Sequence, residues 1–209
     1  MNPLLPKIAV GTLALSTIGT GAYFGAKELF RGTTIKEQLA KENFKFIDLS
    51  NSDQWNLEFE SDSENIKKTW GDKVNSGDKL REKCEAMMSS NFEKHKSDID
   101  NVKKWCGIRS ISNQLARKNK KFLVNLDGTT EEQNRQWTAT YNKRKTDKTN
   151  RTKLGLKGEW PTDNRDEMTE FKRLCGEKGK ADYLANTKET YTVIEDWCTV
   201  EGASKTVTG

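Results

Sequence analysis

The chain contains two very similar sequence segments, which we call the two copies of the repeated line. This repeat constrains its fold more than any other feature. Residues 35–46 read IKEQLAKENFKF, and residues 111–122 read ISNQLARKNKKF. Aromatic, aliphatic and cysteine residues that follow each copy recur in the same order. The paired positions are Trp55 and Trp137, Phe59 and Tyr141, Trp70 and Trp160, Cys84 and Cys175, Ile99 and Tyr191, Val102 and Ile194, Trp105 and Trp197, and Cys106 and Cys198. Because chance would not preserve this order, we infer two tandem modules.

The repeat divides the chain into three parts. Residues 1–32 form an N-terminal segment and linker, residues 33–109 form module 1, and residues 110–209 form module 2. Module 2 contains a basic insertion at 142–158 that has no counterpart in module 1. Its last residues, 199–209, are small and polar, so we expect a flexible tail.

Composition favours a folded protein with small cores. Only 33% of the 209 residues are hydrophobic and 32% are charged, a balance that by itself approaches that of disordered chains. The net charge is nevertheless only +5, and six tryptophans are spread along the chain. Since tryptophan supplies a large buried area, we expect each module to have its own core.

The local patterns predict a mainly α-helical fold with about four helices in each module. Thr34 and Ser110 stand at N-cap positions before the two copies of the repeated line. Ile99, Val102 and Cys106 follow the i, i+3, i+7 spacing of one helix face, as do their partners in module 2. The alternative is an α+β fold with short strands at 44–49 and 122–126 that pair with each other.

Residues 8–26 contain no charge and are long enough to approach the thickness of a bilayer core. We therefore expect an uncleaved N-terminal membrane helix that anchors the chain in the cell membrane. An export signal places the body outside the cell. Lys27, Arg31, Lys36 and Lys41 follow the segment, however, and the positive-inside rule would place the body in the cytoplasm.

The four cysteines occupy equivalent places in the two modules. Cys84 and Cys106 have 21 intervening residues between them, and Cys175 and Cys198 have 22. An even number at repeated spacing favours two structural disulfides, Cys84–Cys106 and Cys175–Cys198. The alternative is four buried thiols in a reducing compartment.

Catalytic and metal-binding patterns are missing from the sequence. It has one histidine, His95, no C-x₂₋₄-C pair, no phosphate-binding glycine loop and no nucleophile motif. We expect neither an enzyme nor a cofactor or metal site. We interpret the repeated tryptophans as core residues rather than as a platform for a ligand.

The insertion at 142–158 is the one strongly basic stretch, and we interpret it as a solvated loop. Contact with a polyanion is the functional alternative for it, and nucleic acid is not an expected partner. The candidate contact residues are Lys143, Arg144, Lys145, Lys148, Arg151, Lys153 and Lys157.

Taken together, the N-terminal span, TIKEQLAKENFKFIDL and WCGIRSISNQLARKNKKFL resemble the paralogous families of uncharacterised proteins in hemotropic mycoplasmas. The resemblance covers nearly the whole chain and carries over no catalytic or binding residue. It implies a cell-envelope protein with an extracellular body that contacts host or other surface proteins, or varies antigenically. The alternatives are an anchored intracellular scaffold with free thiols and a polyanion-binding module.

Overall fold

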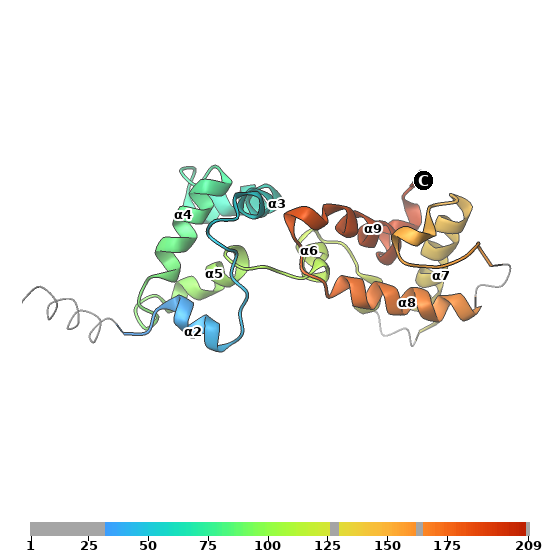
Figure 1. Cartoon of the computed structure of the whole chain (residues 1–209), viewed down its shortest axis with the longest axis horizontal. Helices are drawn as coiled ribbons and strands as arrows, with labels where there is room; N and C mark the ends of the chain where they lie inside the picture. The colour runs from blue at the N-terminus through green and yellow to red at the C-terminus, as the bar shows by residue number, and fades with distance from the viewer. Residues whose placement is uncertain (1–31, 126–129, 162–164, 208–209) are drawn as a thin grey trace, which may run out of the picture.

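The computed structural model describes residues 32–125, 130–161 and 165–207, and in these ranges the protein is mainly α-helical with no β-strand (Figure 1). The expected membrane helix at 8–26 lies outside these ranges. No helix within them is long and apolar enough to cross a bilayer.

Each module contributes four described α-helices in the same order. Those of module 1 are α2 (Ile35–Lys41), α3 (Ser52–Trp70), α4 (Gly77–Met88) and α5 (Ile99–Trp105). Those of module 2 are α6 (Ile111–Arg117), α7 (Glu131–Thr146), α8 (Arg165–Gly179) and α9 (Lys188–Cys198). Short 3₁₀ turns complete the path: η1 (Lys96–Asp98), η2 (Leu123–Asn125), η3 (Arg151–Lys153), η4 (Ala185–Thr187) and η5 (Glu201–Ser204).

The two copies of the repeated line fold alike because their capping residues match. Thr34 accepts a hydrogen bond from the Glu37 amide to begin α2, and Ser110 accepts one from the Asn113 amide to begin α6. The predicted N-caps are therefore confirmed. Just beyond the ends of both helices an asparagine has a positive φ, 57° at Asn43 and 55° at Asn119. Asparagine tolerates this left-handed conformation better than most residues.

In each module an isolated β-bridge links the segment after the first helix to the chain that follows the last helix. Phe46 pairs with Gly107 in module 1, and Phe122 pairs with Thr199 in module 2. The alternative α+β fold, with strands at 44–49 and 122–126 paired with each other, is therefore wrong for the described residues. Each of these phenylalanines pairs with the chain that leaves the last helix of its own module.

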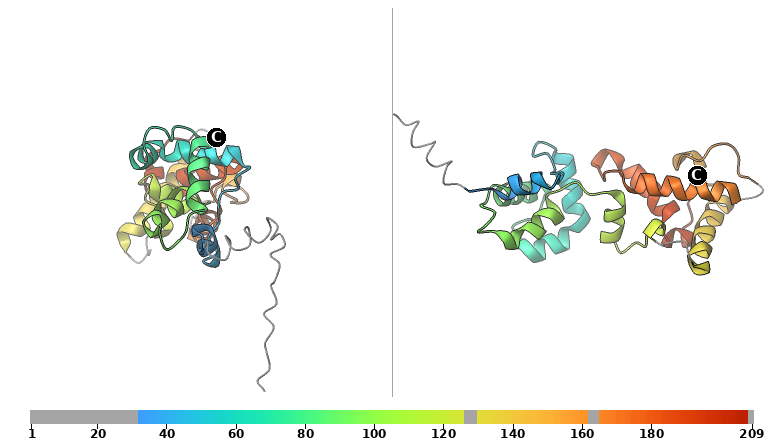
Figure 2. Two further views of the ribbon diagram at one scale, coloured as in Figure 1. Left: turned by 90° about the vertical axis from the view of Figure 1, so that its left-hand side faces the viewer. Right: turned by 90° about the horizontal axis from the view of Figure 1, so that it is seen from below.

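Two hydrophobic clusters, one for each module, hold the helices together. Module 1 packs around Trp55, Leu80 and Trp105, and module 2 around Trp137 and Trp197, all of them buried. Among the members of the two hydrophobic clusters, Leu57 of α3 crosses the module boundary and packs into the cluster of module 2. The modules lie end to end, with α3 facing α6 and the start of α9 (Figures 1 and 2).

Two expectations for module 2 are wrong. The insertion is not a solvated loop, because its first residues complete α7 and its Leu154 and Leu156 are buried in the core. The tail is ordered through residue 207, since η5 packs against α7 and Gly202 is buried. The insertion enters the core because its basic stretch contains leucines, whose apolar side chains can be buried. The tail can pack closely because Gly202 has no side chain.

Candidate functional site

The two predicted disulfides are present and buried. Cys84 of α4 is bonded to Cys106, the residue after α5, and Cys175 of α8 is bonded to Cys198 of α9. The chain therefore has no free thiol to act as a nucleophile or to bind a metal. In both modules the bridge joins the third helix to the end of the fourth.

A buried ionic cluster joins the modules, and we call its four residues Glu58, Asp62, Arg109 and Arg117 the latch. Glu58 accepts hydrogen bonds from Arg109 at 2.6 Å and from Arg117 at 2.8 Å. The Glu58 side chain is 2% exposed and each arginine side chain 11% exposed, so solvent screens these pairs weakly.

Hydrogen bonds satisfy the remaining charges of the latch. Both arginines donate to the backbone oxygen of Lys104, and Trp105 donates to Asp62 at 2.8 Å. Burial lowers the pKa of Arg109, and the charge of Glu58 opposes that effect. Burial would raise the pKa of Asp62, but hydrogen bonds from Asn65 and Trp105 lower it overall.

A second contact between the modules is made by Gln54, which is 2% exposed. Its amide nitrogen donates to the backbone oxygen of Tyr183 at 3.1 Å, and its carbonyl accepts from the backbone amide of Ala185 at 2.9 Å. One glutamine of α3 thus binds two backbone groups beside η4. Since both polar ends are used, Gln54 fixes this segment against α3.

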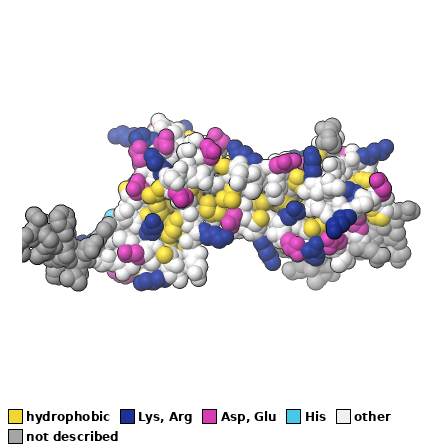
Figure 3. Space-filling view, in the orientation of Figure 1, with side chains coloured by type: hydrophobic (Ala, Val, Ile, Leu, Met, Phe, Trp, Pro, Cys, Tyr) yellow, Lys and Arg dark blue, Asp and Glu magenta, His cyan; other side chains and the backbone are white. Residues whose placement is uncertain are grey.

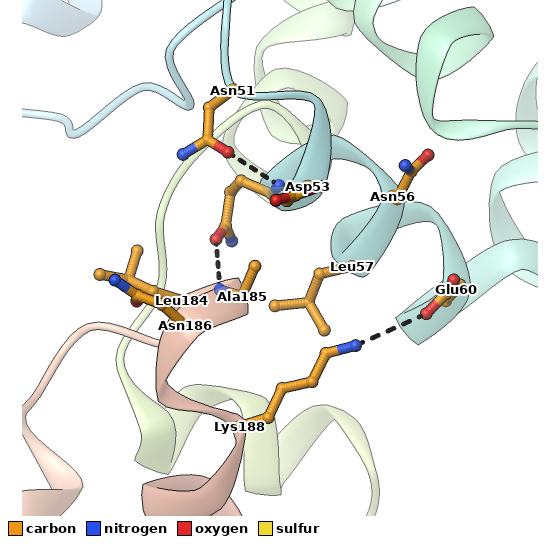
Figure 4. Close-up of a pocket in the computed structure, with 10 residues that line it drawn as sticks. Asn51, Asp53, Asn56, Leu57, Glu60, Leu184, Ala185, Asn186 and Lys188 are labelled. Atoms are coloured by element: carbon orange, nitrogen blue, oxygen red, sulfur yellow. Dashed lines mark hydrogen bonds and ion pairs between the residues drawn. The ribbon is translucent and has the colours of Figure 1, made fainter.

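Beside this contact lies a cleft of about 550 Å³ between α3 and η4. We call it the inter-module cleft. Leu57 and Ala185 face each other across it, and Lys188 extends toward Glu60 (Figure 4). The lining residues are Asn51, Asp53, Gln54, Asn56, Leu57, Glu60, Leu184, Ala185, Asn186 and Lys188.

A smaller hollow of about 270 Å³ continues past the pair formed by Glu60 and Lys188. Both residues, together with Leu57, line the cleft and the hollow. The hollow adds Tyr183 and Tyr191, whose rings lie 5.0 Å apart. Burial raises the pKa of both tyrosines, so both are neutral hydroxyl donors at neutral pH.

The structure does not gather the candidate polyanion contacts into one surface. Arg144 is fully buried, and Arg151 is 5% exposed and pairs with Glu167. Burial lowers the pKa of Arg144. Lys143 pairs with Asp147 at 2.6 Å, and Lys145 donates to the backbone of Pro161.

Lys148, Lys153 and Lys157 are exposed, and polyanion contact remains a prediction for these three. Positive and negative side chains alternate over the face drawn in Figure 3, without a single-sign patch. Such a mixed distribution of charge does not provide the single-sign surface that concentrates a polyanion.

No group of metal-ligating side chains exists among the described residues. His95 is exposed and lies 3.1 Å from Asp98. Trp55 and Trp197 are buried in the cores, while Trp160 stacks against Trp197 and Trp70 meets Trp105 edge-on. The tryptophans therefore fill the modules rather than line the cleft.

The sequence carries a signal for the residues between the modules. Gln54, Glu58 and Asp62 recur every fourth residue, which places three polar side chains on one face of α3. Each is buried or nearly so. A polar stripe beside the core face of a helix indicates a polar contact with a neighbouring unit.

Comparison of the chain with protein-family models, with curated proteins and with solved structures finds no match. The features that bear on function are therefore those of the chain itself: two modules that each contain one disulfide, the latch and the inter-module cleft.

Proposed function

We propose that the chain is a non-enzymatic surface protein, anchored in the cell membrane by residues 8–26, whose two-module body binds a partner outside the cell through the inter-module cleft. The observation that carries this proposal is the pair of disulfides at equivalent positions. Disulfides persist in oxidising compartments and are rare in the cytosol. They support a body outside the cell, rather than the cytoplasmic body that the positive-inside rule predicts.

Binding rather than catalysis is supported by the chemistry of the junction. The latch and Gln54 use their polar groups to hold the modules, and the cysteines are bonded. The cleft walls come from both modules, and ligand sites are frequent at such junctions. The resemblance to mycoplasma surface families supports host contact or antigenic variation as the role of this binding.

The proposal is tested on intact cells that carry the full chain. Externally added protease should remove the body, and peptide mapping without reductant should recover both disulfide-linked peptide pairs. A protease-resistant body that becomes sensitive only after lysis contradicts the proposal. Alkylation of all four cysteines by a permeant reagent in intact cells would favour the intracellular scaffold instead.

A further inference from the structure

The inter-module cleft keeps polar groups that the protein itself does not use. The side chains of Asp53 and Asn186 make no hydrogen bond or ion pair with any residue that the structure describes. Asn51 uses its carbonyl oxygen to cap α3, which leaves its amide N–H groups available. The amides of Asn51 and Asn186 lie on the same side of the cleft, one from each wall (Figure 4). The site therefore offers donors and acceptors together.

The walls of this cleft are fixed before any ligand arrives. Gln54 binds the backbone on both sides of Leu184, and the latch holds α3 against module 2. Both modules are also cross-linked internally by their disulfides. A preformed site loses little conformational entropy on binding, so ordering of the walls subtracts little from the free energy of binding.

The charges of the lining restrict the class of ligand. Asp53 and Glu60 supply two carboxylates against the single ammonium of Lys188, so an acidic ligand is repelled. The apolar lining is limited to Leu57, Leu184 and Ala185, and the cleft has no aromatic wall. Peptide interfaces need a buried apolar or aromatic anchor, which this cleft does not provide.

Carboxylates and carboxamides that stand close together match the adjacent hydroxyls of a sugar, because a carboxylate accepts two hydrogen bonds while an amide both donates and accepts. We infer that the inter-module cleft binds an uncharged oligosaccharide. The inference deepens the proposed function. It rests on that function only for the location of binding, which is outside the cell. It names Asp53, Asn51 and Asn186 as the residues that bind hydroxyl groups.

The smaller hollow extends this site along α3. Glu60 and Lys188 are 4.0 Å apart, too far for a hydrogen bond, so both keep their capacity to bind a ligand. Beyond them lies Tyr191, which is half-buried and presents an aromatic surface together with a hydroxyl. Aromatic rings pack against the C–H face of a sugar, so a second sugar unit fits at this end.

The test uses the full chain, purified with both disulfides intact, on an array of neutral oligosaccharides. The strongest binder on the array is then titrated into ¹⁵N-labelled protein, and we expect shifts of the amides that line the cleft. Asp53→Ala and Asn186→Ala should each weaken binding about tenfold, as expected for a lost hydrogen bond to a charged or polar group. Asp72→Ala is the matched control, because Asp72 is an exposed residue that does not line the cleft.

Asn186→Ala and Asp72→Ala should unfold at the temperature of the parent chain, since neither side chain makes a hydrogen bond or ion pair with a described residue. Asp53→Ala should unfold at a slightly lower temperature, because Asp53 lies in the first turn of α3. Absence of binding to any glycan on the array overturns the inference. Shifts confined to residues outside the cleft also overturn it, as does binding to a peptide library alone. This last result leaves the proposed surface role standing, whereas a body found inside the cell contradicts that role without changing the glycan result.

Discussion

Helices α3 and α7 occupy the same place in their modules, yet their polar faces differ in charge. At the positions where α3 has Glu58 and Asp62, α7 has Thr140 and Arg144. The carboxylates of α3 bind Arg109, at the end of module 1, and Arg117 of module 2. Arg144 instead donates to backbone oxygens of Gly202 and Lys205, in the segment that follows α9.

This difference shows which parts of a duplicated module are shared and which are free to change. The hydroxyl N-caps at Thr34 and Ser110, the core tryptophans and the disulfides are equivalent in both copies. The outward face of the second helix is not, because each module meets a different neighbour there. Four predictions test this division, from the largest expected effect to the smallest.

Loss of a disulfide should have the largest effect, and it should be alike in the two modules. The loops closed by Cys84–Cys106 and Cys175–Cys198 have nearly equal length, with separations of 22 and 23 residues. Replacing either pair by alanine should lower the free energy of unfolding by about 3 kcal/mol in the chain-entropy model. Urea unfolding of both variants checks this. If removal of only one of the two disulfides lowered the free energy of unfolding, the two disulfides would not have equivalent roles in their modules.

Glu58→Thr gives α3 the residue that α7 carries and should separate the modules. It leaves Arg109 without its carboxylate and Arg117 with Asp62 alone at 3.7 Å, at side-chain exposures of 11% for each arginine. Because some solvent reaches these arginines, we expect a loss of about 2 kcal/mol in the free energy of unfolding, below the full penalty for a buried charge. Glu64→Gln, at an exposed position of the same helix, is the control and should change stability little. Equal effects of the two substitutions would show that the latch contributes nothing.

Arg144→Met tests the other side of the comparison. Its Nε and Nη1 groups are buried without a hydrogen-bond partner in the structure. An apolar side chain of similar length therefore removes a desolvated charge together with two hydrogen bonds and the ion pair with Asp147. We expect global stability to change by less than about 1 kcal/mol. The segment from Gly202 to Val207 should exchange its amide hydrogens faster, as measured by hydrogen exchange. Unchanged protection of this segment would contradict the role given to Arg144.

The smallest effect is the pH dependence of the latch. The pKa of Asp62 in the folded protein lies below its ordinary value of 3.8, so Asp62 stabilises the fold above that pH. This stabilisation is lost as the pH falls through the lowered pKa. Asp62→Asn should therefore reduce the difference between the free energy of unfolding at neutral pH and that below about pH 3. An unaltered difference would mean that Asp62 binds protons equally in both states.

Much of the framework could be predicted from the sequence because it depends on local spacing. The repeated line, the N-caps at Thr34 and Ser110 and the cysteine pairs all lie within short stretches. They led to a mainly helical chain and to the correct disulfide pairing.

The polar stripe of α3 indicates a contact with a neighbouring unit. The partners in this contact could not be predicted, because they lie far apart in the chain. Glu58 and Arg117 are 59 residues apart, and Gln54 meets Ala185 across 131 residues. Burial of Arg144 and Arg151 was missed for the same reason, since a basic stretch looks solvated until its partners in the fold are known. A cleft that exists only where two modules meet has no local signature.

The central claim is that the latch holds two copies of one module as a single rigid body, and one distance tests it most directly. Spin labels attached at cysteines introduced at Lys73 and Lys153, both exposed and in different modules, report the spacing between the modules. The native cysteines are all bonded and do not react. We predict a single narrow distance distribution in the parent chain and a broad one in Glu58→Thr. A broad distribution in the parent chain would contradict the claim.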